Sequence, residues 1–215
     1  MTKNISSLHL DILNKARQEA LKKLLPLAKD FVLGGGTALA LQISHRMSYD
    51  FDFFSKKALA KNLLKTISQV ISIGNVSVDS HEELTIFTKD NVKVTFLYYP
   101  FKDMYAIEEF ENGLKLFSVK DIAIKKAYTI GRRGEYRDYF DLYSILKDSY
   151  IDFPQLISDA KDIYGTIFEE KIFLQQLVYF DDLLNFDIIP IPNHVIPPPD
   201  EVKKFFEKLV KEHIN

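Results

Sequence analysis

Residues 31–54 read FVLGGGTALALQISHRMSYDFDFF, and this segment decides the predicted fold. The apolar run Phe31–Leu33 indicates a short buried strand, and the three glycines after it permit a sharp turn. A helical pattern begins at Thr37, which we predict to be the N-cap, and extends to about His45. A second apolar run, residues 51–54, predicts another strand. The segment therefore predicts a strand, a glycine turn, a helix and a second strand.

Two aspartates, Asp50 and Asp52, alternate with phenylalanines around that second strand. Side chains at i and i+2 of a strand leave from the same face, so the two carboxylates can hold one divalent cation, Mg²⁺ or Mn²⁺. The run is apolar enough to be central in a sheet, where two like charges are costly unless a cation neutralises them. A helix start after glycines suits a phosphate. Together these features predict chemistry on a nucleotide. Taken singly, a turn without a ligand and solvent-facing edge-strand aspartates remain the alternatives.

The composition is that of a globular chain of 215 residues, with 47% hydrophobic and 27% charged residues. A formal net charge of -2 gives no general attraction to nucleic acid, so any RNA contact needs a local basic patch. The aromatic residues do not alternate with basic ones and are assigned to the core. The absence of cysteine excludes disulfides and thiolate metal sites. Since neither a secretory signal nor a membrane span is recognisable, we predict a cytoplasmic protein.

The rest of the chain predicts an α+β protein with two parts, a core over residues 1–117 and a helical part over residues 118–215 packed on it. In the core, helices are predicted over residues 8–24, ended by Pro26, and 57–73, ended by Gly74. The predicted strands that follow are Val76–Val78, Leu84–Thr88 and Val92–Tyr99, the last two joined by a hairpin turn. Later helices are predicted at Tyr136–Lys147, Pro154–Ile163, Phe168–Leu184 and Asp200–His213, after a helix near Ser118 and with a Pro-rich extended arm over residues 185–200.

Three segments, in order, carry a resemblance to a known family. The first is the glycine turn, Gly35-Gly36-Thr37, and the second is RMSYDFD at residues 46–52. The third is a block over residues 121–143 that contains Lys126, Arg133-Gly134 and the run RDYFDL. Together they resemble the nucleotidyltransferase superfamily, and within it the AbiEii/AbiGii toxin-type nucleotidyltransferases of bacterial toxin–antitoxin and phage-defence modules.

The resemblance implies a mixed sheet with flanking helices, followed by a helical C-terminal part. It also implies Mg²⁺-dependent transfer of a nucleoside monophosphate from an NTP to an acceptor hydroxyl. For some relatives the acceptor is an RNA such as tRNA, and RNA and protein both stay open as acceptors here. A cognate antitoxin protein is a further partner that the resemblance implies.

The resemblance assigns roles to individual residues. Asp50 and Asp52 are predicted to be catalytic and to bind the metal. The residues predicted to contact the NTP phosphates are Gly35, Gly36, Thr37, Arg46, Ser48 and Lys126. Arg46 has an alternative role, capping the C-terminus of the preceding helix.

A further candidate set lies in the third segment and comprises Arg133, Arg137, Asp138 and Asp141. Its structural alternative makes Asp138 a partner of the helix dipole and Asp141 an internal partner of Arg137. Nearby, Asp121 and Lys125 stand at i,i+4, a spacing that predicts a solvated salt bridge on a helix.

The sequence departs from the family pattern at a third carboxylate. Relatives read like Val-Lys-Val-Asp-Phe on a later strand, whereas residues 92–96 of this chain read VKVTF. Thr95 cannot be an anionic ligand or a general base near neutral pH. Asp79 could substitute from a neighbouring strand, although a surface position is the simpler interpretation. A second hypothesis follows, a degenerate member that binds nucleotide or a partner protein without turnover.

Overall fold

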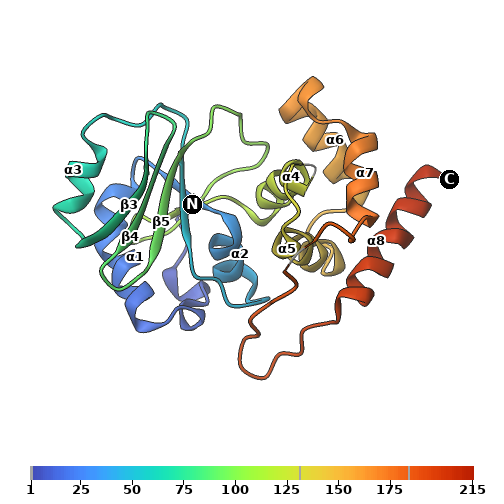
Figure 1. Ribbon diagram of the computed structural model, residues 1–215, viewed down its shortest axis with the longest axis horizontal. Helices are drawn as coiled ribbons and strands as arrows, with labels where there is room; N and C mark the ends of the chain where they lie inside the picture. Colours follow the sequence, from blue (N-terminus) through green and yellow to red (C-terminus); the bar gives the residue numbers. More distant parts are fainter. Residues whose placement is uncertain (1, 131, 184) are drawn as a thin grey trace. The chain divides into compact units, whose positions relative to one another are not determined.

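The computed structural model describes residues 2–130, 132–183 and 185–215, apart from the side chain of Ala28. These residues form two compact units. The first runs to Phe101 and resumes at Ala106–Ser118, and the second comprises Lys102–Tyr105 and Val119–Asn215. The first unit contains the sheet and the second is helical (Figure 1).

The first unit is built on one mixed sheet of seven strands in the order β3-β4-β5-β2-β1-β7-β6. The strand β2, which carries Asp52, is the fourth of seven and therefore central, as its apolar sequence predicts. The strands are β1 (Val32–Gly34), β2 (Phe51–Ser55), β3 (Ile73–Asp79), β4 (Glu83–Thr88), β5 (Lys93–Tyr98), β6 (Glu108–Glu109) and β7 (Lys115–Leu116). The helices are α1 (Lys15–Ala28), α2 (Gly35–Ile43) and α3 (Leu63–Ser68), after two short 3-10 turns, η1 (Ile5–Ser7) and η2 (Leu10–Ile12). The predicted α+β class is confirmed.

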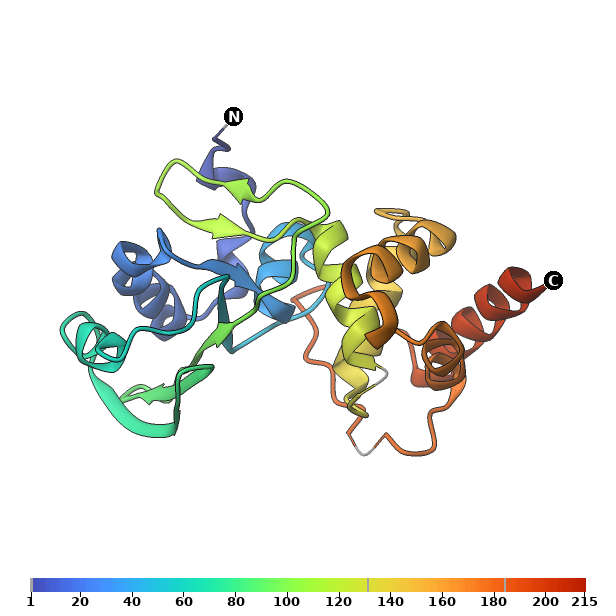
Figure 2. The same cartoon turned by 90° about the horizontal axis from the view of Figure 1, so that it is seen from above.

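The two faces of β2 differ in character. Phe51 and Phe53 are 0% and 1% exposed and belong to the core, and Figure 2 shows α1 and α2 on one side of strands β3, β4 and β5. Asp52 alternates with them, so its side chain leaves from the opposite face. β2 pairs antiparallel with β1 and parallel with β5, which sets Asp52 opposite Gly34 and opposite Thr95. The register thus brings three separate sequence motifs to one point of the sheet.

Several predicted element boundaries in the first unit are wrong. α2 begins at Gly35 with Gly34 as N-cap, so Thr37 lies inside the helix. α1 continues past Pro26, because packing of its apolar face outweighs the hydrogen bond that a proline removes. The long helix predicted over residues 57–73 is reduced to α3. Its first part is instead held as a loop, where the N–H of Leu59 donates to the carbonyl of His81 over 2.9 Å.

The second unit consists of helices α4 (Val119–Ile130), α5 (Tyr136–Lys147), α6 (Phe153–Tyr164), α7 (Glu170–Val178) and α8 (Pro199–Ile214), with one 3-10 turn, η3 (Gly165–Ile167). α7 is shorter than predicted, and the predicted last residue of that helix, Leu184, lies outside the described residues. Residues 185–198 form a turn and segments without regular secondary structure, whereas the last two residues assigned to the Pro-rich arm begin α8. No helix in the described ranges is long and apolar enough to cross a membrane.

Candidate active site

The glycine turn and the central strand meet at Asp52. Gly35 has a φ of +65°, the left-handed region that favours glycine. A Cβ added to Gly35 would lie 2.5 Å from the Asp52 Oδ2 atom. The backbone at the start of α2 therefore lies directly against a carboxylate, and only a residue without a side chain allows this approach.

The next glycine brings a cation to the same place. A Cβ on Gly36 would lie 2.3 Å from Arg46 Nη2 and 3.2 Å from Ser48 Oγ. Arg46 is only 5% exposed, and its Nη1 donates to the carbonyl of Met47 over 2.9 Å. The guanidinium thus lies at the N-terminal end of α2, and the alternative role as a C-terminal cap is wrong. A helix N-terminus and a guanidinium both carry positive charge, and together they suit a phosphate.

Thr37 ties the helix to the segment before β2. Its Oγ1 lies 2.5 Å from the carbonyl oxygen of Asp50 and 2.9 Å from Ser48 Oγ. A carbonyl can only accept, so the single hydroxyl proton of Thr37 goes to Asp50 and the hydroxyl of Ser48 donates to Thr37. Any contact of Thr37 with a phosphate therefore falls to its backbone N–H.

The donor set of Asp50 and Asp52 fits a hard divalent cation. Both residues are half-buried at the start of the central strand. Within the described part of the chain, no group of three or more His, Cys, Asp or Glu side chains is arranged to hold a metal. Mg²⁺ usually takes one or two protein carboxylates and completes its shell with water and substrate phosphates. Two aspartates near a glycine turn at a helix start are compatible with that pattern.

The position of the expected third carboxylate is occupied by Thr95, directly opposite Asp52 in the ladder between β2 and β5. Asp79 does not substitute for it, because that residue is exposed on the edge strand β3. Thr95 instead contacts Thr85, and the hydroxyl of Thr85 donates to Glu83 Oε1 over 2.7 Å. Glu83 is not among the residues predicted from the sequence, although its spacing from Thr85, i and i+2 on one strand, is the signal that places both on one face.

In the second unit, Lys126 joins two buried carboxylates. Its Nζ lies 2.6 Å from Asp138 Oδ1 and 2.5 Å from Asp141 Oδ2, and Arg133 Nε lies 2.8 Å from Asp138 Oδ2. Asp138 and Asp141 are 2% and 0% exposed. Burial raises the pKa of Asp138, but the charges of Lys126 and Arg133 outweigh burial and hold it below the ordinary value.

Four of the five residues named from the third motif are thus brought together, and Arg137 is not among them. Arg137 is exposed and its guanidinium lies 3.5 Å from the carboxylate of Glu135. The alternative in which Asp141 partners Arg137 is therefore wrong.

The prediction of a solvated salt bridge between Asp121 and Lys125 is also wrong. Asp121 is fully buried and accepts hydrogen bonds from the N–H groups of Met104 and Tyr105. These bonds hold residues 102–105 within the second unit.

Comparison with known proteins identifies the family. Residues 19–213 match the family described as nucleotidyl transferase AbiEii toxin, type IV toxin–antitoxin system. The chain belongs to the AbiEii nucleotidyltransferase toxin family. The resemblance drawn from the three motifs is confirmed.

Other known proteins are similar to this chain over most of its length. The uncharacterized protein aq_aa25 of Aquifex aeolicus is 32% identical to this chain. The match covers 94% of this chain and 98% of aq_aa25. The crystal structure of JHP933 from Helicobacter pylori has a TM-score of 0.55 at 20% identity, covering 93% of this chain and 92% of that one. The nucleotidyltransferase toxin MenT4 of Mycobacterium tuberculosis has a TM-score of 0.50 at 15% identity, covering 92% of this chain and 80% of that one. These structural likenesses support the fold.

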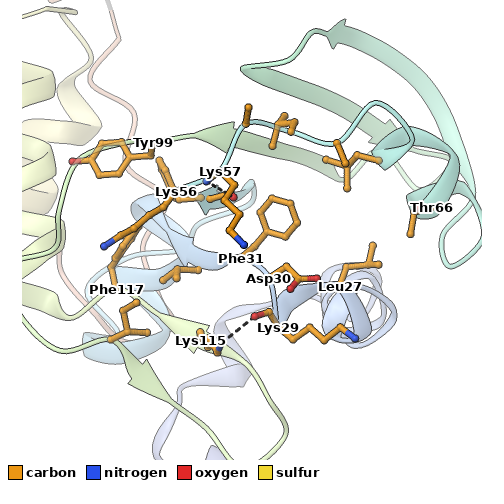
Figure 3. Close-up of a pocket in the computed structure, with 18 of the residues that line it drawn as sticks. Leu27, Lys29, Asp30, Phe31, Lys56, Lys57, Thr66, Tyr99, Lys115 and Phe117 are labelled. Atoms are coloured by element: carbon orange, nitrogen blue, oxygen red, sulfur yellow. Dashed lines mark hydrogen bonds between the residues drawn. The ribbon is translucent and has the colours of Figure 1, made fainter.

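A basic and aromatic pocket of about 500 Å³ opens in the first unit of this AbiEii member (Figure 3). Its lining includes Val32 and Phe54, which pair with each other in the ladder between β1 and β2, two positions from the pair of Gly34 and Asp52. Phe54 shares a face with Asp52, and its ring would be 2.5 Å from a Cβ on Gly34. The pocket therefore adjoins the glycine turn. Its aromatic residues are Phe31, Phe54, Tyr99 and Phe117, and its charged ones are Lys29, Lys56, Lys57, Lys115, Asp30 and Glu109.

We expect Gly35→Ala to destabilise the AbiEii fold and to weaken nucleotide binding. A side chain at φ +65° costs roughly 1–2 kcal/mol, and the added Cβ also displaces the Asp52 carboxylate. Gly113→Ala is the matched control, because Gly113 has a φ of +85° and nothing within 4 Å of an added Cβ. Urea unfolding and titration with Mg-NTP measure the two effects. Equal losses of stability with unchanged nucleotide binding in both variants would contradict this account of the turn.

Proposed function

We propose that this AbiEii member is an enzyme that transfers a nucleoside monophosphate from an NTP to an acceptor hydroxyl, with Mg²⁺ or Mn²⁺ as cofactor. The observation that carries the proposal is the contact between the Asp52 carboxylate and Gly35 at the start of α2. A metal-binding carboxylate and a phosphate-binding helix start are thereby within reach of one triphosphate.

Each side chain then has a task in the first unit. Asp50 and Asp52 hold the metal, which when bound neutralises the triphosphate and the charge that develops on the leaving pyrophosphate. The N–H groups of Gly35 and Gly36 and the guanidinium of Arg46 bind phosphate oxygens. Thr37 and Ser48 fix the helix start against the segment that carries Asp50.

Lys126 stays proposed as a ligand of the NTP phosphates. In the second unit its ammonium is held by Asp138 and Asp141, so the two carboxylates orient it and reduce its net attraction for an anion. Arg133 adds a second positive charge to this cluster. Asp138 and Asp141 therefore act through Lys126. Arg137 has no task in this proposal, because it is exposed and contacts Glu135.

The basic and aromatic pocket supports RNA, such as the end of a tRNA, as the acceptor rather than protein. Its lining carries four lysines and two acidic residues, a net charge of +2 in a chain whose formal net charge is -2. Lysines bind backbone phosphates, and aromatic rings stack on unpaired bases. A pocket of about 500 Å³ beside the glycine turn has room for a nucleotide.

We expect Lys57→Glu to weaken use of an RNA acceptor about tenfold, because a charge-assisted contact contributes roughly 1.5–3 kcal/mol. Figure 3 shows the Lys57 ammonium within the pocket, beside Phe31. Lys22→Glu on α1 makes the same charge change at an exposed residue outside the lining. The measurement is KM for a labelled RNA at two salt concentrations. If Lys57→Glu and Lys22→Glu raised the KM for RNA equally, the support for RNA binding in this pocket would be lost.

The transfer itself is tested with α-labelled NTPs, Mg²⁺ or Mn²⁺ and either total RNA or total protein. Label on RNA supports the proposal, and label on protein alone redirects it to a protein acceptor. Thr95 favours the second candidate function, nucleotide or partner binding without turnover. Binding of Mg-NTP with no label transferred to either acceptor would support that candidate and overturn the enzyme.

We also propose that the chain is the toxin of a toxin–antitoxin pair, with an antitoxin protein as partner. Membership of the AbiEii toxin family supports this role. Induced expression should arrest growth, and co-expression of an adjacent antitoxin gene should restore it. If expression of the wild type and of an Asp52→Asn variant slowed growth equally, that result would contradict a toxic transferase activity.

A further inference from the structure

Four polar side chains line one face of the sheet beside Asp52. Thr95 stands opposite Asp52 between parallel strands, and Thr85 stands opposite Thr95 between antiparallel strands. Residues opposite one another in a ladder project from the same face. Glu83 precedes Thr85 by two residues on β4 and shares that face. The row therefore runs Asp52, Thr95, Thr85, Glu83, across three adjacent strands.

The last three members of this row form a chain of hydroxyl contacts. Thr85 Oγ1 lies 2.7 Å from Glu83 Oε1 and 3.4 Å from Thr95 Oγ1. A carboxylate only accepts, so the one proton of Thr85 goes to Glu83 and the hydroxyl of Thr95 donates to Thr85. The Thr95 oxygen then keeps lone pairs that can accept a further proton. Hydrogen bonds of this kind are often long before substrate binds and shorten in the reacting complex.

Burial shields the two hydroxyls from solvent. Thr85 and Thr95 are 4% and 5% exposed, so little water reaches them. In the proposed function Asp50 and Asp52 bind the metal, and Asp79 is exposed on the edge strand. Glu83 is the carboxylate that the described hydrogen bonds connect to the position opposite Asp52.

We propose that Glu83 receives the proton of the acceptor hydroxyl through Thr85 and Thr95. This inference rests on the proposed transferase function. It explains how a chain with threonine at the third-carboxylate position retains a base for the reaction. Glu83 does not touch substrate, so it acts as a positioning and proton-accepting group behind the two threonines.

The step balances in protons and electrons. The acceptor O–H gives its proton to Thr95 Oγ1, Thr95 passes its own proton to Thr85, and Thr85 passes its own to the carboxylate of Glu83. The acceptor oxygen forms a bond to the α-phosphorus with the electron pair of its former O–H bond. The bond from that phosphorus to the bridging oxygen of pyrophosphate breaks, and pyrophosphate leaves with the pair.

Glu83→Gln is the first test, measured as label transfer at saturating Mg-NTP. We expect kcat to fall about 100-fold, the scale of a general base, while KM and binding affinity for Mg-NTP stay unchanged. Glu82→Gln is the matched control, since it makes the same change at the neighbouring exposed carboxylate. A Glu83→Gln enzyme within twofold of the wild type would overturn the inference.

Thr85→Val tests the connection, since valine keeps the shape of threonine and removes the hydroxyl. We expect the same loss of kcat as in Glu83→Gln, and no further loss when both changes are combined, because both break one route. Losses that multiply in the double variant would overturn a shared route. Thermal unfolding of each variant verifies that the fold persists.

Rescue provides the readout that a structural role would not give. Thr95→Asp in the Glu83→Gln background places a carboxylate beside Asp52 and should restore kcat at least tenfold, since that carboxylate accepts the proton directly. Rescue supports the relay, and a folded double variant with no gain in kcat contradicts it. A wild type that binds Mg-NTP but transfers nothing would instead overturn the proposed function. The two failures are thus distinguishable.

Discussion

Asp52→Asn is expected to lower the rate of nucleotide transfer roughly a thousandfold, because several kcal/mol of charge stabilisation depend on the metal that this carboxylate holds, and each 1.36 kcal/mol is tenfold in rate. Asparagine keeps the shape of the side chain against Gly35, so the fold should persist. Asp50→Asn should have a similar effect, since both carboxylates serve one cation. The measurement is label transfer together with titration of Mg-NTP.

The control for both variants is Asp79→Asn, which makes the same change at an exposed aspartate of β3. It should leave transfer and binding as in the wild type. If Asp52→Asn bound Mg-NTP with wild-type affinity and kept its rate, the metal site would not be at these two aspartates. If Asp79→Asn alone lost activity, the third carboxylate would lie on the edge strand after all.

Lys126→Met should destabilise the second unit by about 3–5 kcal/mol, the usual cost of removing one partner from a buried ion pair. Asp138 and Asp141 are almost fully buried and both contact the Lys126 ammonium. Lys120→Met on the same helix is the control, because Lys120 is exposed and its loss should change stability by less than about 0.5 kcal/mol. Urea unfolding followed by helical circular dichroism measures both. A loss below about 1 kcal/mol for Lys126→Met would show that the cluster does not hold this unit together.

The same cluster gives the stability a dependence on pH. The folded pKa of Asp138 lies below the ordinary value of an aspartate, so its contribution to stability is present above that ordinary value and is lost as the pH falls through the folded pKa. The wild type should therefore lose this part of its stability in acid. In Lys126→Met the folded pKa of Asp138 rises, so the acid-dependent loss should shrink. A wild type and a variant with parallel stability profiles below pH 4 would contradict the assignment.

Local sequence predicts the elements at the centre of the candidate site well, because they lie close together in the chain. The glycine turn, α2 and β2 fall within residues 31–55, and a turn between a strand and a helix is encoded by neighbouring residues. Even there, the N-cap is misplaced by three residues, since Gly34 takes that position and Thr37 bonds to Asp50 instead. Hydroxyl residues near a helix start have two competing partners, and tertiary contacts decide between them.

The remaining parts of the site depend on contacts between distant residues. Glu83 is placed near Asp52 only by the order β4-β5-β2 and by the register of two ladders. The basic and aromatic pocket gathers its rings and lysines from four segments, so no alternation in the sequence announces it. Asp121 fits the spacing of an exposed salt bridge, yet it is buried against two backbone N–H groups whose approach no local pattern encodes.

The central claim, that Asp50 and Asp52 bind a metal opposite the glycine turn that receives the triphosphate, is tested most directly by a crystal structure. The protein would be crystallised with Mn²⁺ and an NTP analogue carrying a methylene group between the α- and β-phosphorus, which blocks transfer. We predict an anomalous manganese peak between the carboxylates of Asp50 and Asp52, with phosphate oxygens at the N–H groups of Gly35 and Gly36. Manganese bound away from both aspartates, or a triphosphate that does not contact the turn, would contradict the claim.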